Sequence, residues 1–388
     1  MKALLVSSYF LPYVSGVTEY CRTLANSLVS EGCEVEVLTG RHRSDLPSVE
    51  SMDGVTVRRE PINFRLSKGY ISLPFIRSFL ECHTNFDVVN LHAPMLEAGL
   101  FASLSKRPVV LTYQCDMASV GSPLERVAVA AVQQSARVAA AQSANVAVLS
   151  SDYAASSRIL RNIDVTQIRP PNRFHKRATL QQSQTSEPDV FQRQADVVRL
   201  GFVGRFVTEK GIEVLLDSIR LITQGKVVLH LAGDFGEVAG GSNFDQLRSK
   251  LLALGSQVSV LGKLSDDQLI DHYNTIDILV LPSVNRFEAF GMVQLEAMSF
   301  GAIPVASNMP GVRDLVLETR AGELADPGSA RSLAAAIDRA IERRRRVSRA
   351  ETAKTALKAF PQTLGQQYLA AFESVRASRL ENVRAPPR

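Results

Sequence analysis

The chain repeats one pattern twice: short apolar runs alternate with segments of helical periodicity, and the series restarts near the middle of the chain. The strand-like runs of the first half are residues 3–6, 34–38, 55–57, 88–91, 109–112 and 146–149. Those of the second half are residues 198–203, 227–231, 258–261, 278–281 and 303–306. Alternation of this kind is typical of parallel βαβ units. The pattern therefore predicts an α/β fold with two doubly wound, Rossmann-like domains.

The length of 388 residues is too great for one typical domain. We predict a first domain over residues 1–177, a polar linker rich in Gln and Ser over 178–196, and a second domain over 197–360. Doubly wound sheets bind their ligands at the carboxyl ends of the strands. The expected binding site is therefore a cleft that the two domains face.

Composition and charge narrow the class of protein. The formal net charge is only +5 and no arginine-rich arm stands out, so nucleic acid is not an expected partner. The four cysteines are not spaced as metal ligands or as a Cys-x-x-Cys motif, which favours a reducing, cytoplasmic location. No apolar run approaches the roughly 20 residues of a membrane span, and the first residues turn polar too soon for a signal peptide.

The most informative segment follows the strand-like run Ile278–Leu281, which Pro282 closes. It carries Glu288 and Glu296, eight residues apart, and between them Phe290-Gly-Met-Val293 is typical of a helix start. Backbone N–H groups at a helix start attract phosphate, and a glycine there lets a ligand approach closely. Flanking carboxylates suit hydroxyl groups attached to that phosphate. The structural alternative is an ordinary amphipathic helix with solvated glutamates.

A second segment, Gly204-Arg-Phe-Val-Thr-Glu-Lys-Gly211, comes directly after the strand-like run 198–203. It places two cations, Arg205 and Lys210, at the carboxyl end of that strand. An arginine binds phosphate through several donors, and a lysine adds a compact point charge. The segment therefore indicates a site for a phosphorylated ligand, with a surface turn as the structural alternative.

Together, the two segments resemble the Glu-x7-Glu motif and the Gly-Arg-x4-Lys-Gly pattern of the retaining glycosyltransferases of family 4. The resemblance covers most of the chain and is strongest over residues 201–311. It implies the GT-B fold, in which two Rossmann-like domains face an interdomain cleft. In this family the last helix often returns to the first domain, and here that helix would span residues 361–378.

The resemblance also implies roles for individual residues. Arg205 and Lys210 would stabilise the donor diphosphate as the sugar departs, and Glu288 would bind hydroxyls of the transferred sugar; these three are the catalytic candidates. Glu296 would hold the ribose hydroxyls of the donor. Backbone groups around the helix start would meet phosphate and sugar oxygens, namely those of Phe290, Gly291, Met292 and Val293.

Weaker signals come from four loops. The backbone of Leu264 would contact the nucleobase. Gly16 stands where the family usually has two glycines bordering the donor phosphates, but Ser15 replaces the other one, and a simple helix-starting turn is as good an interpretation. Gln114 would contact the donor sugar and stands where many members have His. His92 and Asp116 are acceptor-binding candidates, with a buried structural histidine as the alternative for the former.

The activity implied by the resemblance is transfer of a hexose from a nucleoside diphosphate sugar, GDP-mannose or a UDP-hexose, to a saccharide or lipid-linked acceptor. No Asp-x-Asp motif is present, so cationic side chains would replace a metal ion, and no cofactor is expected. Two alternatives remain: another GT-B enzyme, such as a nucleotide-sugar epimerase or a phosphorylase, or a catalytically silent nucleotide-sugar-binding subunit. The mixed basic and aromatic residues of 63–80 fit either a packed loop or a peripheral contact with the inner membrane face.

Overall fold

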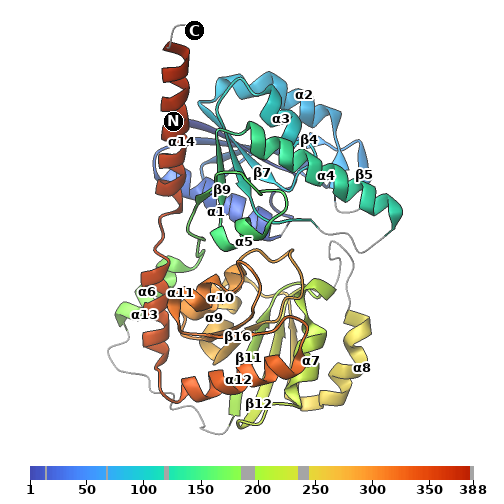
Figure 1. The fold of residues 1–388 in the computed structure, drawn as a ribbon, viewed down its shortest axis with the longest axis vertical. Coiled ribbons are helices and arrows are strands. Elements are labelled where there is room, and N and C mark those ends of the chain that lie inside the picture. Colours follow the sequence, from blue (N-terminus) through green and yellow to red (C-terminus); the bar gives the residue numbers. More distant parts are fainter. Residues whose placement is uncertain (14, 67–68, 118–121, 185–196, 235–243, 385–388) are drawn as a thin grey trace. The chain divides into compact units, whose positions relative to one another are not determined.

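The computed structural model describes residues 1–13, 15–66, 69–117, 122–184, 197–234 and 244–384 (Figure 1). The chain divides into two compact units. The first comprises Met1–Pro171 together with Thr363–Arg388, and the second comprises Asn172–Gln362. Each unit is built on a mainly parallel sheet, which confirms the predicted α/β class with two Rossmann-like domains.

The sheet of the first unit has eight strands in the order β10-β9-β8-β7-β1-β2-β4-β3. The strands are β1 Lys2–Ser7, β2 Glu34–Arg41, β3 Val49–Met52, β4 Val55–Pro61, β7 Val88–Ala93, β8 Val109–Tyr113, β9 Asn145–Val148 and β10 Thr166–Gln167. All neighbours are parallel except β3 and β4, which pair antiparallel. Every residue of β7 is buried, as expected for a strand with both faces of the sheet covered.

Helices and one hairpin complete the first unit. They are α1 Gly16–Ser30, the hairpin of β5 Phe64–Leu66 with β6 Gly69–Ile71, α2 Leu73–Cys82, α3 Ala98–Leu104, α4 Pro123–Gln142, α5 Ser151–Ser156 and α14 Leu364–Arg384. The last helix packs against α1 and β8. Its Tyr368 hydroxyl lies 3.0 Å from that of Tyr20 and 2.8 Å from Thr112 Oγ1, so a segment from the end of the chain completes the core of the first unit.

The second unit has six parallel strands in the order β13-β12-β11-β14-β15-β16. The strands are β11 Val197–Val203, β12 Lys226–Ala232, β13 Val258–Gly262, β14 Ile278–Leu281, β15 Ile303–Ser307 and β16 Glu323–Ala325. The helices are α6 His175–Gln184, α7 Ile212–Ile219, α8 Phe244–Leu254, α9 Asp266–Thr275, α10 Met292–Ser299, α11 Asp314–Thr319, α12 Ala330–Arg344 and α13 Arg349–Ala359.

Alternate residues of the central strand β14 pack into different cores. Ile278 and Val280 face the cluster formed with α7, α8 and α12, whereas Leu279 faces the cluster formed with α9 and α10. This period of two, with apolar side chains on both faces, is what a doubly covered parallel strand requires. Because both faces of β14 are covered, the apolar run is continuous in the sequence.

The predicted domain boundaries need correction. The second unit begins at Asn172, and residues 175–184 form α6, so the linker predicted over 178–196 is wrong for its first part. The helix is held because Ala178 is fully buried beside Phe174 and Tyr273, and because Gln181 and Asn274 exchange side-chain hydrogen bonds. Residues 185–196 lie outside the described part of the chain.

The segment over residues 63–80 is a hairpin followed by α2, with two kinds of side chain. Tyr70 and Phe75 are buried in the first unit, whereas Phe64 and Leu73 are exposed by 71% and 67%. The segment therefore packs part of its aromatic side chains into the first unit and exposes the others to solvent. None of the described helices combines the length and the apolar character that crossing a bilayer requires.

Candidate active site

The order of strands in the second unit creates one topological switch point. The chain runs outward from β11 to β12 and β13, and then returns to place β14 on the other side of β11. The neighbouring strands pair through Leu200 with Ile278 and Gly201 with Leu279. Ligands of doubly wound sheets bind where two loops diverge in this way, at the carboxyl ends of the strands. The loops after β11 and β14 carry the two segments that the sequence singled out.

Close backbone approach joins these two loops. Gly211 has a φ of +67°, and a Cβ on it would lie 2.0 Å from the carbonyl oxygen of Pro282, so only glycine fits. Next to this contact, the N–H of Val284 donates to the Glu209 carbonyl at 3.0 Å. The contact fixes the register of one loop against the other and brings the side chain of Lys210 to that of Glu288.

Lys210 Nζ donates a short hydrogen bond to Glu288 Oε2, and the pair is partly buried. The hydroxyl of Ser283 lies 3.3 Å from the same oxygen. Arg205, on the same loop as Lys210, keeps 35% of its side chain exposed, and its guanidinium lies 3.8 Å from Glu209. Two cations and two carboxylates thus meet at the switch point, which suits a ligand that carries both negative charge and hydroxyl groups.

Helix α10 begins at the same place without a side-chain cap. Gly291 is its N-cap residue, with a φ of +77°, and a Cβ there would lie 2.2 Å from Leu281 Cδ2. Met292 and Val293 in the first turn are half-buried. Phe290 is 2% exposed and packs against Phe360, so its ring belongs to the core and only its backbone can reach a ligand. Uncapped N–H groups at a helix start favour an anion.

Glu296 lies in the second turn of α10 and has partners that the sequence did not indicate. Its Oε2 accepts from the Tyr273 hydroxyl at 2.8 Å, and its Oε1 accepts from Arg173 Nε at 2.9 Å. Burial works against the charge of Arg173, but the Glu296 carboxylate outweighs it and raises the pKa of the guanidinium. The two donors fix the orientation of the Glu296 carboxylate. Arg173 and Tyr273 stand in no recognisable motif.

Leu264 lies in the loop after β13, just before the capping box with which Ser265 begins α9. It is half-buried and packs on the core of the second unit. The loop is tied to the centre of the sheet because Gly233 N–H donates to the Gly262 carbonyl at 2.8 Å. The predicted second-unit residues therefore all lie on loops or helix starts at the carboxyl edge of one sheet.

The first unit has a switch point of the same kind, between β1 and β7. Gly16 opens α1 in the loop after β1, and the space where its Cβ would lie is empty. Ser15, which replaces the family's other glycine, caps α1: its side chain accepts from the Thr18 N–H, and the Thr18 hydroxyl accepts from the Ser15 N–H. Helix capping is the physical reason for this departure from the motif.

Three further predicted residues lie at the ends of β7 and β8. His92 is fully buried, burial lowers its pKa to about 3, and its Nδ1 lies 3.2 Å from Gln114 Nε2. The Asp116 carboxylate accepts from the Tyr113 hydroxyl at 2.5 Å and from Ser157 at 2.6 Å. His92 therefore contacts Gln114, the predicted donor-binding residue. The Asp116 carboxylate is held in place by two hydroxyl donors of the same unit.

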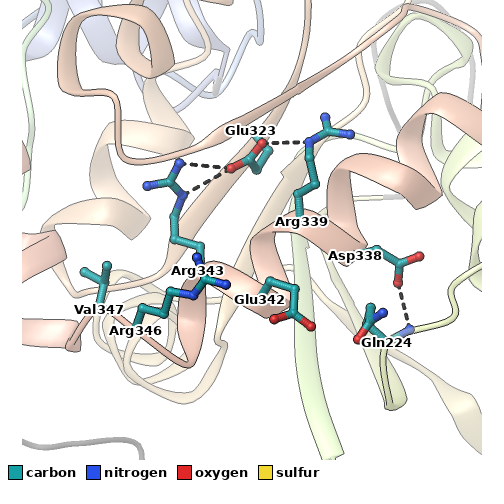
Figure 2. A pocket seen from close by; sticks show the side chains of 8 residues that line it. All are labelled: Gln224, Glu323, Asp338, Arg339, Glu342, Arg343, Arg346 and Val347. Atoms are coloured by element: carbon teal, nitrogen blue, oxygen red, sulfur yellow. Dashed lines mark hydrogen bonds and ion pairs between the residues drawn. The ribbon is translucent and has the colours of Figure 1, made fainter.

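A hollow of about 410 Å³ lies elsewhere in the second unit and is lined by Glu323, Arg339 and Arg343 among others, whose side chains are drawn in Figure 2. Glu323 begins β16, so the hollow lies at the amino edge of the sheet, away from the loops described above. Its carboxylate accepts from Arg339 at 2.9 Å and from Arg343 at 3.0 Å. The lining residues Asp338 and Glu342 with Arg346 complete a set of three acidic and three basic side chains, so the hollow carries no net charge and is not the candidate site. Within the described ranges, no group of three or more His, Cys, Asp and Glu side chains is placed to hold a metal ion.

Two family models match the chain in succession. The model described as glycosyl transferase 4-like domain matches residues 15–171, and the model described as glycosyl transferases group 1 matches residues 183–358. The chain is a family 4-type glycosyltransferase. The first match lies within the first unit of this glycosyltransferase and ends where that unit's first segment ends, and the second match carries Arg205, Lys210, Glu288 and Glu296.

Two relatives that match this glycosyltransferase over most of their own length are themselves named as sugar transferases. An uncharacterised glycosyltransferase of Methanocaldococcus jannaschii is 25% identical over 88% of this chain and 89% of that protein. A GDP-mannose-dependent alpha-mannosyltransferase of Mycolicibacterium smegmatis is 28% identical, over 98% of this chain and 99% of that protein.

Solved structures establish the fold of the glycosyltransferase as GT-B. Sucrose-phosphate synthase from Thermosynechococcus elongatus superposes with a TM-score of 0.76 at 19% identity, over 97% of this chain and 99% of that one. Anabaena HepE, in complex with UDP and glucose, superposes with a TM-score of 0.68 at 21% identity, over 96% of this chain and all of that one.

Proposed function

We propose that the protein is a retaining glycosyltransferase that moves a hexose from a nucleoside diphosphate sugar to a saccharide or lipid-linked acceptor. The observation that carries this proposal is the meeting of Arg205, Lys210, Glu288 and the uncapped start of α10 at one switch point. The mannosyltransferase relative that uses GDP-mannose and the neighbour in complex with UDP and glucose support a GDP- or UDP-linked donor.

In the proposed complex, the diphosphate lies at the N–H groups of Gly291, Met292 and Val293, which need an anionic partner. Arg205 and Lys210 supply the positive charge that stabilises the leaving diphosphate. They take the part that a divalent cation plays in transferases of the other common fold, so we expect turnover without metal. Glu296, oriented by Arg173 and Tyr273, accepts hydrogen bonds from the ribose hydroxyls.

The transfer step needs no side chain as a base. The bond between the anomeric carbon and the donor phosphate oxygen breaks, and the acceptor hydroxyl attacks the same face of the sugar. Its proton passes to the leaving phosphate oxygen. Glu288 holds hydroxyls of the transferred sugar, and Gln114 positions that sugar without exchanging a proton, since an amide does not titrate. The product therefore keeps the anomeric configuration of the donor.

A thermal-shift screen of UDP-, GDP- and ADP-sugars tests the donor, because a ligand that binds only the folded state raises the melting temperature by mass action. Slow hydrolysis of the stabilising donor without acceptor distinguishes a transferase from a silent subunit, which would bind without hydrolysis. An epimerase would return an altered nucleotide sugar instead. Absence of any stabilising nucleotide sugar would reject the proposal.

A further inference from the structure

Four strand ends of the first unit bring unusual side chains together at its switch point. Tyr9 and Tyr13 follow β1, His42 follows β2, Tyr70 lies on β6 beyond β4, and Glu97 follows β7 just before α3. In the sheet these strands are neighbours, in the order β7-β1-β2-β4. Their carboxyl ends therefore lie along one edge, where a doubly wound sheet binds its ligand.

The aromatic rings of this group form a continuous wall. Tyr9 and Tyr13 are stacked with centroids 4.5 Å apart, and His42 meets both edge-on. Tyr70 meets Tyr9 at 5.3 Å and fits because residue 40 is glycine, whose Cβ would lie 2.5 Å from the Tyr70 ring. Tyr9, Tyr13 and His42 keep partial exposure, so the wall reaches the surface of the unit.

Buried polar atoms in and beside this wall lack partners within the described residues, among them Glu97 Oε1, Tyr70 Oη and His42 Nδ1. Glu97 is 6% exposed, it does not cap α3, and its Oε1 has no hydrogen-bond partner within the described residues. The Tyr70 hydroxyl, in a residue 4% exposed, lies near the Gly40 backbone, but the Gly40 N–H is directed at Ser8 O at 3.2 Å and leaves this hydroxyl without a well-formed hydrogen bond within the described residues. Burial raises the pKa of Glu97 to about 7. Burial is also the main cause that raises the pKa values of Tyr9 and Tyr70, and the nearby Glu97 carboxylate adds a smaller contribution to both.

Buried polar groups are nearly always hydrogen-bonded, because leaving one unpaired costs free energy. Such groups beside one aromatic wall point to atoms that a ligand supplies. A hydroxyl group satisfies Glu97 in either protonation state, since it both donates and accepts, whereas an anion would be repelled by the ionised form. The nearby guanidinium groups each have an acidic or carbonyl partner: Arg43 pairs with Asp45, Arg59 with Glu50 and Arg65 with the His42 carbonyl. Nε of Arg59 has no partner within the described residues.

We propose that Glu97, Tyr70 and the wall of Tyr9, Tyr13 and His42 form a subsite for a polyol ring of the acceptor. The ring packs its C–H face on the wall and places a hydroxyl at Glu97 Oε1 and another at Tyr70 Oη. The subsite rests on the proposed function and adds the chemical class that the first unit recognises: an uncharged, hydroxyl-rich ring. Glu97 is a binding residue here and takes no part in proton transfer.

Saturation-transfer NMR on the full chain tests the subsite with three probes: methyl α-mannoside, methyl α-glucoside and myo-inositol, each with UDP or GDP present. At least one polyol should receive saturation from the wild type. Glu97→Leu and Tyr9→Ala should weaken its binding about tenfold or more. The matched control is Glu36→Gln, a half-buried carboxylate on β2 that pairs with Arg58 at 2.7 Å, and it should bind as the wild type does.

Glu97→Leu should also melt at or above the wild-type temperature, because an unpaired buried carboxyl is replaced by an apolar side chain. Loss of polyol binding together with an unchanged or higher melting temperature would show that Glu97 serves ligand binding and not stability. Unchanged polyol binding in both variants would overturn the subsite, and so would nucleotide binding without any polyol signal. Competition by inorganic phosphate would assign an anion site instead. Absence of nucleotide signals would reject the proposed function itself.

Discussion

Lys210 and Glu288, 78 residues apart in the sequence, form a partly buried ion pair at the point where β11 and β14 part. In this state the lysine is neutralised by the carboxylate that we assign to the sugar. A donor that carries both a diphosphate and hydroxyl groups can satisfy the two at once, with phosphate on Lys210 and a hydroxyl on Glu288. The pair therefore holds the two side chains in position until the donor separates them.

Removing either cation should slow transfer without unfolding the protein. We expect Arg205→Ala and Lys210→Ala each to lower kcat/KM by roughly 2–4 kcal/mol of transition-state stabilisation, since donors aimed at developing charge are lost. Lys250→Ala is the matched control, because Lys250 on α8 also pairs with a carboxylate, Asp217 on α7 at 2.7 Å, away from the loops after β11 and β14. Turnover within about threefold of wild type in both site variants would refute the proposed role of Arg205 and Lys210 in stabilising the leaving diphosphate.

Chelation should leave activity intact. Arg205 and Lys210 are expected to carry the charge compensation of the diphosphate, so transfer assayed in excess EDTA should proceed at the rate seen without it. Dialysis against EDTA followed by addition of Mg²⁺ or Mn²⁺ provides the check. Complete loss on chelation with recovery on adding metal would show that a cation belongs to the site.

The anomeric configuration of the product tests the mechanism. A time course by NMR with a donor of known configuration should show retention. Gln114→His should stay active, because both side chains can hydrogen-bond the sugar, and Gln114→Ala should weaken binding by about 1 kcal/mol without abolishing transfer. An inverted product would mean that a protein base operates, and an inactive Gln114→Ala with normal folding would mean that Gln114 does more than position the sugar.

The approach of Gly211 to Pro282 predicts a local backbone effect. Gly211→Ala adds a methyl group 2.0 Å from a carbonyl oxygen at a φ of +67°, so urea unfolding should show a loss of roughly 3 kcal/mol or more. Gly255→Ala is the control: its φ is +54°, nothing lies within 4 Å of the added Cβ, and about 1 kcal/mol is expected. Equal losses in the two variants would mean that the contact is not needed.

His272 should make stability depend on pH. It is 5% exposed, and burial followed by the charge of His230 lowers its pKa to about 4. An unfolded histidine has a pKa of about 6.5, so the unfolded chain takes up the proton first as the pH falls. The contribution is complete above pH 6.5 and disappears towards pH 4, with roughly 2 kcal/mol lost by pH 5. The melting temperature, measured from pH 7.5 to 5, should fall less steeply in His272→Gln than in the wild type. An equally steep fall in both proteins would exclude His272 as the cause.

The sequence predicted the strands and the charged loops of the second unit well, because both have local signatures. Ile278–Leu281 is a continuous apolar run. Arg205 and Lys210 stand between two glycines, directly after the apolar run of residues 198–203. Such features depend on neighbours in the chain. The family description and the GT-B fold follow from the same residues.

Other features depend on contacts between distant residues, and the sequence did not reveal them. Arg173 reaches Glu296 across 123 residues, and neither belongs to a pattern that would pair them. Helix α6 was taken for linker because its composition is polar, although one face is held by Ala178 and Gln181. The orphan oxygen of Glu97 is visible only when the whole surroundings of the side chain are known.

The hydroxyl contacts of Tyr368 with Tyr20 and Thr112 affect the order in which the protein can form on the ribosome. Residues 1–171 are synthesised long before α14, so the face of α1 that this helix covers stays open while the second unit is made. The second unit is one uninterrupted segment and can fold as it emerges. The first unit, although it is made first, is finished last, and a nascent chain released before α14 would carry an incomplete core.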